Sequence, residues 1–284
     1  MILDEILART RADLAVRKAS RPLSDIEKAL PAGPSVRSLA KALRPGGKNA
    51  GTGATTAGAA TEPPTAGVAC MAEFKRKSPS SWWIREGAKA GEIARVYATS
   101  GAAALSVVTN EPFFGGTLDD LTAAHAATSL PVMCKDFIVD AYQLAEARAA
   151  GADAALLIVA ALSDPELSAL MAVGELYGLE LLVEAHDADE VARAVKAGAS
   201  IIGLNNRDLR TFKIDPELAA RLRPQIPPDR VSVAMSGIKR AADLEQARLA
   251  AIDAILVGEA LMRADDCGAA LRELLAPPGR GGRA

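Results

Sequence analysis

The chain has 284 residues, of which 50% are hydrophobic but only 4% aromatic, and its formal net charge is −2. There is no basic excess to bind a nucleic-acid backbone or an acidic membrane surface. No apolar run reaches the roughly 18 residues that would span a bilayer. Three widely spaced cysteines and the lack of a signal peptide's apolar core favour a reducing, cytoplasmic location.

The first 44 residues are predicted to form a helical extension. Residues 2–19 carry apolar side chains at helical spacing, and Ser24 with Glu27 matches a capping box that would begin a second helix. The composition changes at residues 45–66, which are almost all Gly, Ala, Thr and Pro and predict a flexible linker. Residues 276–284 are predicted to be a disordered tail.

Eight apolar runs alternate with helical segments between residues 67 and 275. Such alternation indicates parallel strands that helices cover on both faces. Eight units over this length predict an α/β fold, a closed (β/α)8 TIM barrel that follows the N-terminal helical extension. An open doubly wound sheet is the alternative, but no GxGxxG motif follows the first strand.

Charged residues end three of the predicted strands, and the active sites of such barrels lie at the carboxyl ends of the strands. The first strand ends in Glu73 and Lys75, the third in Lys135 and the fifth in Glu184. A structural ion pair would explain Glu73 and Lys75 alone, but four charged groups that converge on one mouth favour general acid–base chemistry. For His186, just past the fifth strand, a loop or capping role is favoured, and contact with the substrate is the alternative.

Glycines follow the last two predicted strands, in residues 236–239 and 257–260. The loops at these positions often form a phosphate site, because glycine lets backbone N–H groups approach an anion. Ordinary glycine turns are the alternative. These loops predict a small phosphorylated ligand.

Several segments resemble the indole-3-glycerol-phosphate synthase family of tryptophan biosynthesis: AEFKRKSPS, SVVTNEPFFGGTLDDL, LLVEAHD, IGLNNRDLRTF, SGIK and ILVGEALM. The resemblance covers residues 67–275 in the family's order, and the K-x-x-SPS and GxNNRDL segments are specific. It implies ring closure of 1-(o-carboxyphenylamino)-1-deoxyribulose 5-phosphate, with loss of CO2 and water, to give indole-3-glycerol phosphate. It implies no metal and no organic cofactor.

The resemblance also implies roles for the charged residues. Lys135 would be the general acid that polarises the substrate carbonyl. Lys75, paired with Glu73, would hold the substrate carboxylate or transfer protons. Glu184 would stabilise positive charge on the intermediate and serve the dehydration step, and these groups suit cationic intermediates and carbonyl activation.

Further residues would surround the substrate by the same resemblance. Asn205 and Arg207 would position the substrate hydroxyls and the acid–base groups, and Phe114 and Phe137 would flank the anthranilate ring. The phosphate and ribulose would lie among Ser78, Ser236, Gly237 and Gly258, with Glu259 in the same loop.

Three features depart from the family's pattern. The seventh strand usually reads S-E-S-G-I, but Met235 stands here at the position of the carboxylate. Trp82 and Trp83 follow the SPS segment, where small polar residues are usual, and the linker at residues 45–66 is longer than expected.

Two alternatives remain at this stage. One is a non-catalytic or weakly active paralogue that binds a phosphorylated ligand, which the loss of a carboxylate at Met235 favours. The other is a related isomerase such as phosphoribosylanthranilate isomerase, for which a Cys/Asp pair is expected instead of two lysines and two glutamates.

The expected partner is a small phosphorylated substrate, with no nucleic acid or membrane. A monomer is expected, with a weak homodimer as the alternative.

Overall fold

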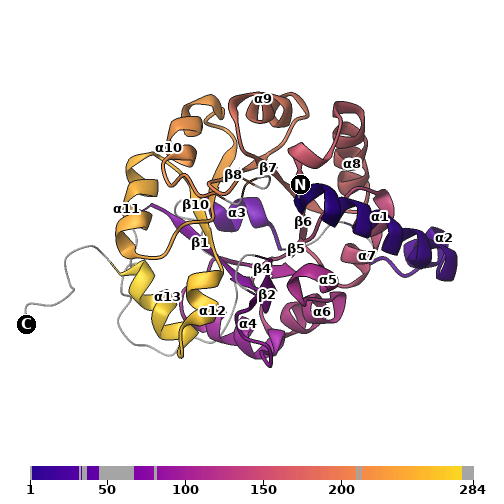
Figure 1. Cartoon of the computed structure of the whole chain (residues 1–284), viewed down its shortest axis with the longest axis horizontal. Helices are drawn as coiled ribbons and strands as arrows, with labels where there is room; N and C mark the ends of the chain where they lie inside the picture. The colour runs from indigo at the N-terminus through magenta and orange to yellow at the C-terminus, as the bar shows by residue number, and fades with distance from the viewer. Residues whose placement is uncertain are drawn as a thin grey trace, which may run out of the picture.

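The computed structural model describes residues 2–31, 33, 37–44, 67–79, 82–208, 211 and 213–276. Within them, eight parallel strands close into a barrel in the spatial order β1-β10-β9-β8-β7-β6-β5-β4, with helices around the outside (Figure 1). The barrel strands are β1 (Ala69–Phe74), β4 (Ala104–Val108), β5 (Val132–Lys135), β6 (Ala154–Ile158), β7 (Glu180–Ala185), β8 (Ile201–Asn205), β9 (Val231–Met235) and β10 (Ala254–Val257). The predicted (β/α)8 barrel is confirmed.

Helices connect the strands, as the apolar periodicity predicts. They are α4 (Ala90–Thr99), α5 (Glu111–Phe114), α6 (Leu118–Ala127), α7 (Ala141–Ala149), α8 (Asp164–Leu176), α9 (Ala188–Lys196), α10 (Leu218–Leu222), α11 (Ala241–Leu249), α12 (Glu259–Arg263) and α13 (Cys267–Leu275), with 3-10 turns η1 (Val159–Ala161) and η2 (Arg223–Gln225). None of the helices in the described ranges is long and apolar enough to cross a membrane.

Side chains on the two faces of the strands form two apolar cores. The larger core lies between the strands and the helices and includes Phe74, Leu105 and Leu181. The smaller core fills the barrel interior and includes Met71, Met133 and aliphatic side chains from the other six strands. Because the strands are buried on both faces, their sequences are continuously apolar and only their ends carry charge.

Two helices of the N-terminal extension, the predicted α1 (Ile2–Ser20) and the unpredicted α3 (Leu39–Leu43), contact the two ends of the barrel. The first residues of helix α1 line the mouth, and its far end is attached to α7 by an ion pair of 2.6 Å between Lys18 and Asp140 (Figure 1). Helix α3 contributes two fully buried leucines, Leu39 and Leu43, to the barrel interior. The predicted linker at residues 45–66 lies outside the described residues, as do residues 277–284 of the predicted tail.

Helix α3 is fixed by one carboxylate at the start of β7. Glu180 accepts hydrogen bonds from Ser38 Oγ at 2.6 Å and from the Ala40 backbone N–H at 2.7 Å. Ser38 Oγ in turn accepts the N–H of Lys41 as the helix N-cap. These bonds satisfy the exposed N–H groups of a short helix, which then closes the end of the barrel opposite the mouth.

The capping box expected at Ser24 and Glu27 is wrong. Helix α2 runs over Leu23–Glu27, so Ser24 lies inside the helix, and the N-cap is Pro22, whose side chain makes no capping bond. Glu27 instead accepts a hydrogen bond of 2.7 Å from the Tyr177 hydroxyl on α8's C-terminal end. A tertiary contact therefore uses the carboxylate that the local pattern assigned to the cap.

Leu39→Ala is expected to lower the free energy of unfolding by about 2–5 kcal/mol, because Leu39 is fully buried in the barrel interior. Urea unfolding measured by circular dichroism tests this. Leu249→Ala is the matched control, since Leu249 is 71% exposed on α11. Similar small losses in both variants would contradict the view that α3 closes the barrel.

Candidate active site

One buried carboxylate lies between two ammonium groups at the ends of β1 and β5. Glu73 is 2% exposed, and its Oε1 accepts a hydrogen bond of 2.7 Å from Lys75 Nζ. Lys135 Nζ lies 3.7 Å from the other oxygen, Oε2. Burial raises the pKa of Glu73, but the charges of Lys75 and Lys135 outweigh burial and hold this pKa below its usual value. Glu73 is therefore ionised at neutral pH, and the cluster as a whole is positive.

Glu73 reaches this position because residue 258 is a glycine. A Cβ atom at Gly258 would lie 2.4 Å from Glu73 Oε1 and 3.0 Å from its Cβ and Cδ atoms, which is closer than non-bonded atoms come. Gly258 follows β10, which pairs directly with β1 in the barrel. The structure thus gives Gly258 a steric role beside its predicted role at the phosphate.

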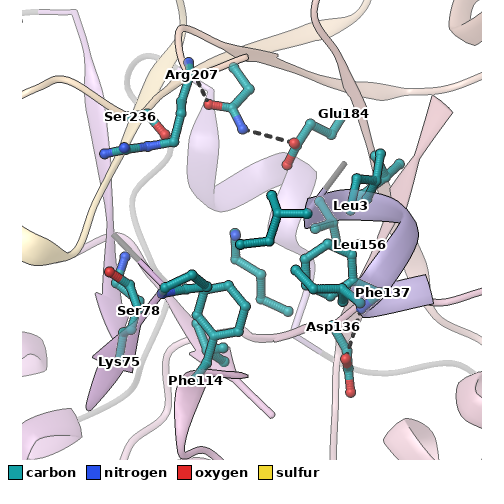
Figure 2. Close-up of a pocket in the computed structure, with 17 residues that line it drawn as sticks. Leu3, Lys75, Ser78, Phe114, Asp136, Phe137, Leu156, Glu184, Arg207 and Ser236 are labelled. Atoms are coloured by element: carbon teal, nitrogen blue, oxygen red, sulfur yellow. Dashed lines mark hydrogen bonds between the residues drawn. The ribbon is translucent and has the colours of Figure 1, made fainter. Parts of the chain in front are cut away.

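A second buried carboxylate stands on the opposite side of the mouth. Glu184, in β7, is 1% exposed and accepts a hydrogen bond of 2.8 Å from Asn205 Nδ2 at the end of β8. Asn205 Oδ1 accepts the Arg207 backbone N–H at 3.0 Å, which fixes the orientation of the amide (Figure 2). Glu184 is therefore held rigidly with one oxygen occupied.

The mouth contains a pocket with an aromatic wall. The rings of Phe114 and Phe137 lie 6.0 Å apart at an interplanar angle of 33°. Leu3 of α1 extends over the same pocket (Figure 2). Of the residues predicted from the sequence, this pocket is lined by Lys75, Ser78, Phe114, Lys135, Phe137, Glu184, Asn205, Arg207 and Ser236.

An adjoining cavity of about 260 Å³ lies beside the loops after β9 and β10 and shares Lys75, Lys135 and Ser236 with the first pocket. The remaining predicted residues line this cavity: Glu73, Gly237, Gly258 and Glu259. Two cations not singled out from the sequence, Lys239 and Arg263, also line it. The carboxylate of Glu259 forms an ion pair of 3.0 Å with Arg263. The structure therefore brings every predicted site residue to one continuous mouth, while their roles stay predictions.

Met235 ends β9 where the family's pattern has a carboxylate. It is 1% exposed and belongs to the apolar core of the barrel interior. A Cβ atom at Gly203 on β8 would lie 2.6 Å from its Sδ atom, so this glycine provides the space for the thioether. Met235 also borders the cavity that contains Glu73 and both lysines. A carboxylate at this position would therefore border the cavity that contains Glu73 and two ammonium groups.

The two tryptophans after the SPS segment form a short hairpin at the mouth. Strand β2 (Lys77–Ser78) pairs antiparallel with β3 (Trp82–Trp83), an element that the apolar pattern did not predict. Lys77 Nζ lies over the Trp82 ring at 4.4 Å, and a Cβ atom at Gly115 would lie 3.0 Å from the Trp83 ring. Close packing against the turn after α5 thus accommodates these large side chains.

The apolar end of α1 is a part of the site that sequence reasoning did not assign to it. Ile2, Leu3 and Ile6 line the pocket beside Phe114 and Phe137. The helical spacing of apolar residues was visible in the sequence. It did not indicate which surface of the barrel they would cover.

Solved structures show similarity at the level of the fold. The chain matches a thiamine phosphate pyrophosphorylase from Pyrococcus furiosus with a TM-score of 0.54 and 17% identity, over 73% of this chain and 93% of that one. A mandelate oxidase variant with benzaldehyde gives a TM-score of 0.55 and 16% identity, over 89% and 90% of the two chains. These similarities support the barrel fold alone.

The sequence comparisons are more specific. The family model described as indole-3-glycerol phosphate synthase matches residues 3–274. A protein of Streptomyces coelicolor named indole-3-glycerol phosphate synthase 2 is 44% identical over 274 residues, which cover 96% of this chain and 98% of the relative. Proteins named indole-3-glycerol phosphate synthase from Burkholderia vietnamiensis and Koribacter versatilis are 44% and 43% identical over 273 residues, with the same coverage. The chain belongs to the indole-3-glycerol phosphate synthase family.

Proposed function

We propose that this chain converts 1-(o-carboxyphenylamino)-1-deoxyribulose 5-phosphate into indole-3-glycerol phosphate, and releases CO2 and water as a carbon–carbon lyase of tryptophan biosynthesis. The observation that carries the proposal is the convergence of Glu73, Lys75, Lys135 and Glu184 on one mouth. These groups supply the proton transfers and charge stabilisation that the reaction needs, without a metal or an organic cofactor.

Lys135 is the proposed general acid for ring closure. Its ammonium group lies between the aromatic pocket and the cavity that contains Glu73, so it can donate to the carbonyl of a substrate that spans both. Protonation of the carbonyl oxygen makes the carbon electrophilic, and the aromatic carbon attacks it. The longer distance to Glu73, 3.7 Å against 2.7 Å for Lys75, leaves Lys135 the freer of the two ammonium groups.

Glu184 is the proposed partner of the positive charge that develops on the ring nitrogen. Its Oε1 is occupied by Asn205, so the carboxylate is already oriented before substrate binds. A fixed carboxylate in a buried site stabilises a developing cation without reorganising. Loss of CO2 then restores electrons to the ring, and loss of the hydroxyl as water with a proton completes the indole.

The two cavities suit the two ends of this substrate. Phe114 and Phe137 provide flat apolar surface for the anthranilate ring. The cavity beside β9 and β10 contains Lys75, Lys239 and Arg263, which favour a phosphate. The alternative, a paralogue that binds a phosphorylated ligand without turnover, would use the same cavities, so activity decides between them.

The purified chain is expected to form indole-3-glycerol phosphate after addition of the carboxyphenylamino substrate. The increase in indole fluorescence measures the product. Lys135→Met is expected to lower kcat by about 10²–10⁴-fold, the usual contribution of a general acid. Lys89→Met is the control, because the Lys89 side chain is 77% exposed. No product from the unaltered chain at high enzyme concentration would refute the proposed activity and favour the non-catalytic paralogue.

Met235→Glu is expected to raise kcat roughly tenfold or more, since a carboxylate there would add a proton acceptor beside two ammonium groups. Met235→Gln is the matched control, with a similar shape and no charge. Steady-state kinetics of both variants separate the two effects. An equal or lower kcat for Met235→Glu would indicate that the site operates with the thioether.

Gly258→Ala is expected to lower kcat/KM by about 10²-fold, because its methyl group would displace Glu73, and a shift of about 1 Å in a catalytic group has this cost. Gly87→Ala is the control, since no atom lies within 4 Å of a Cβ there. The same kinetic assay measures both variants. Unchanged kcat/KM for Gly258→Ala would show that Glu73 tolerates displacement.

A further inference from the structure

His186 places an imidazole between two buried carboxylates at the rim of the proposed site. It follows β7 directly and lies two residues beyond Glu184, with a side chain that is 13% exposed. Glu184 lies on one side of the ring, and Glu190, in the first turn of α9, lies on the other. The ring borders a cavity beside the aromatic pocket that shares Leu3 and Asn205 with it.

One carboxylate oxygen of Glu190 binds both the backbone N–H and the ring of His186. Its Oε2 accepts the His186 backbone N–H at 2.8 Å and lies 3.2 Å from the ring's Nδ1. The Glu190 backbone N–H is itself bonded to the N-cap Asp187 at 2.8 Å, so the carboxylate projects from a fixed helix end. An ionised carboxylate can accept hydrogen bonds but cannot donate them, so Nδ1 carries the proton of this bond.

The other ring nitrogen faces the proposed catalytic carboxylate. His186 Nε2 lies 3.5 Å from Glu184 Oε1, and it is buried with no hydrogen-bond partner among the described residues. If Nε2 were unprotonated, its lone pair would oppose an ionised oxygen in a site from which water is largely excluded. A proton on Nε2 converts this repulsion into an attraction between an imidazolium and a carboxylate.

The surrounding charges favour the imidazolium. Burial lowers the pKa of His186, but the hydrogen bond to Glu190 and the negative charges of Glu184, Glu190 and Asp208 outweigh it, so the pKa lies above its usual value. The segment after β8 also brings Lys213 and Asp215 to the same cavity. Their opposite charges offset each other, whereas the carboxylates nearest the ring act together.

We propose that His186 is a positioning residue of the active site, held as an imidazolium by Glu190 so that it orients Glu184 and keeps it ionised. The proposal rests on the function proposed above, in which Glu184 must be a carboxylate to stabilise the cationic intermediate. Asn205 and His186 then hold the same oxygen, Oε1, from two directions. The second oxygen of Glu184 is left to face the substrate.

The chain contains only two histidines, so the protonation state of each imidazole can be measured directly. Nitrogen-15 NMR of the labelled full-length protein reports the protonation of each imidazole, and His186→Gln assigns the His186 signals, with His125 as the internal reference. His186 is expected to be doubly protonated at neutral pH. Glu190→Gln, which keeps an oxygen for the backbone N–H, is expected to lower the pKa of His186 by about one unit or more.

Asp189→Asn is the matched control, since it removes a carboxylate from the same helix turn at an exposed position that does not contact the ring. It is expected to leave the titration of His186 nearly unchanged. A neutral His186 at pH 7, or equal shifts in the Glu190→Gln and Asp189→Asn variants, would overturn the proposal. This readout needs no turnover, so it stays decisive even if the proposed activity fails.

The pH profile of kcat/KM tests the link to Glu184. Without the imidazolium, ionised Glu184 loses the positive charge beside it, so His186→Gln is expected to move the acidic limb to higher pH by about one unit. A residue with a merely structural role would lower the rate without moving that limb. An unmoved acidic limb in an active His186→Gln variant would therefore refute the positioning role, while leaving the proposed function intact.

Discussion

The position of Glu73 constrains the rest of the mouth, because this one buried carboxylate is paired with two lysines. Burying a charge is costly unless it is paired, and Glu73 is paired twice, at 2.7 Å with Lys75 and at 3.7 Å with Lys135. The position of Glu73 in turn requires a residue without a side chain just after the neighbouring strand β10, and this residue is Gly258. Two ammonium groups against one carboxylate leave the cluster one excess positive charge, which is directed at an anionic substrate.

The N-terminal extension makes this electrostatic arrangement effective. Helix α3 closes one end of the barrel with Leu39 and Leu43, and the first residues of α1 lie over part of the mouth. Charges act over larger distances where water is excluded, so the covering by α1 strengthens the fields around Glu73 and Glu184. The N-terminal extension thus closes one end of the barrel and limits access of water to the other.

The sequence predicted the barrel and the charged residues at its mouth because strands buried on both faces tolerate charge only at their ends. That constraint located Glu73, Lys135 and Glu184 without any contact information. It did not predict which groups would pair, since pairing depends on register and on barrel closure. The expected cap at Ser24 was wrong for a related reason: a distant tyrosine hydroxyl binds Glu27. Local patterns therefore predicted where the charged residues lie in the fold, but not which side chains they contact.

The charges of the mouth define a direction for the substrate. Strands β1 and β7 stand opposite each other in the ring, so Glu73 with its lysines faces Glu184 across the opening. The Glu73 side carries the excess of positive charge and, in our proposal, attracts the substrate's carboxylate and phosphate. The Glu184 side has a carboxylate turned toward the place where a cation develops, and His186 keeps that carboxylate ionised in our proposal. One orientation of the substrate satisfies both sides, so the same charges that stabilise the intermediates also select how the substrate binds.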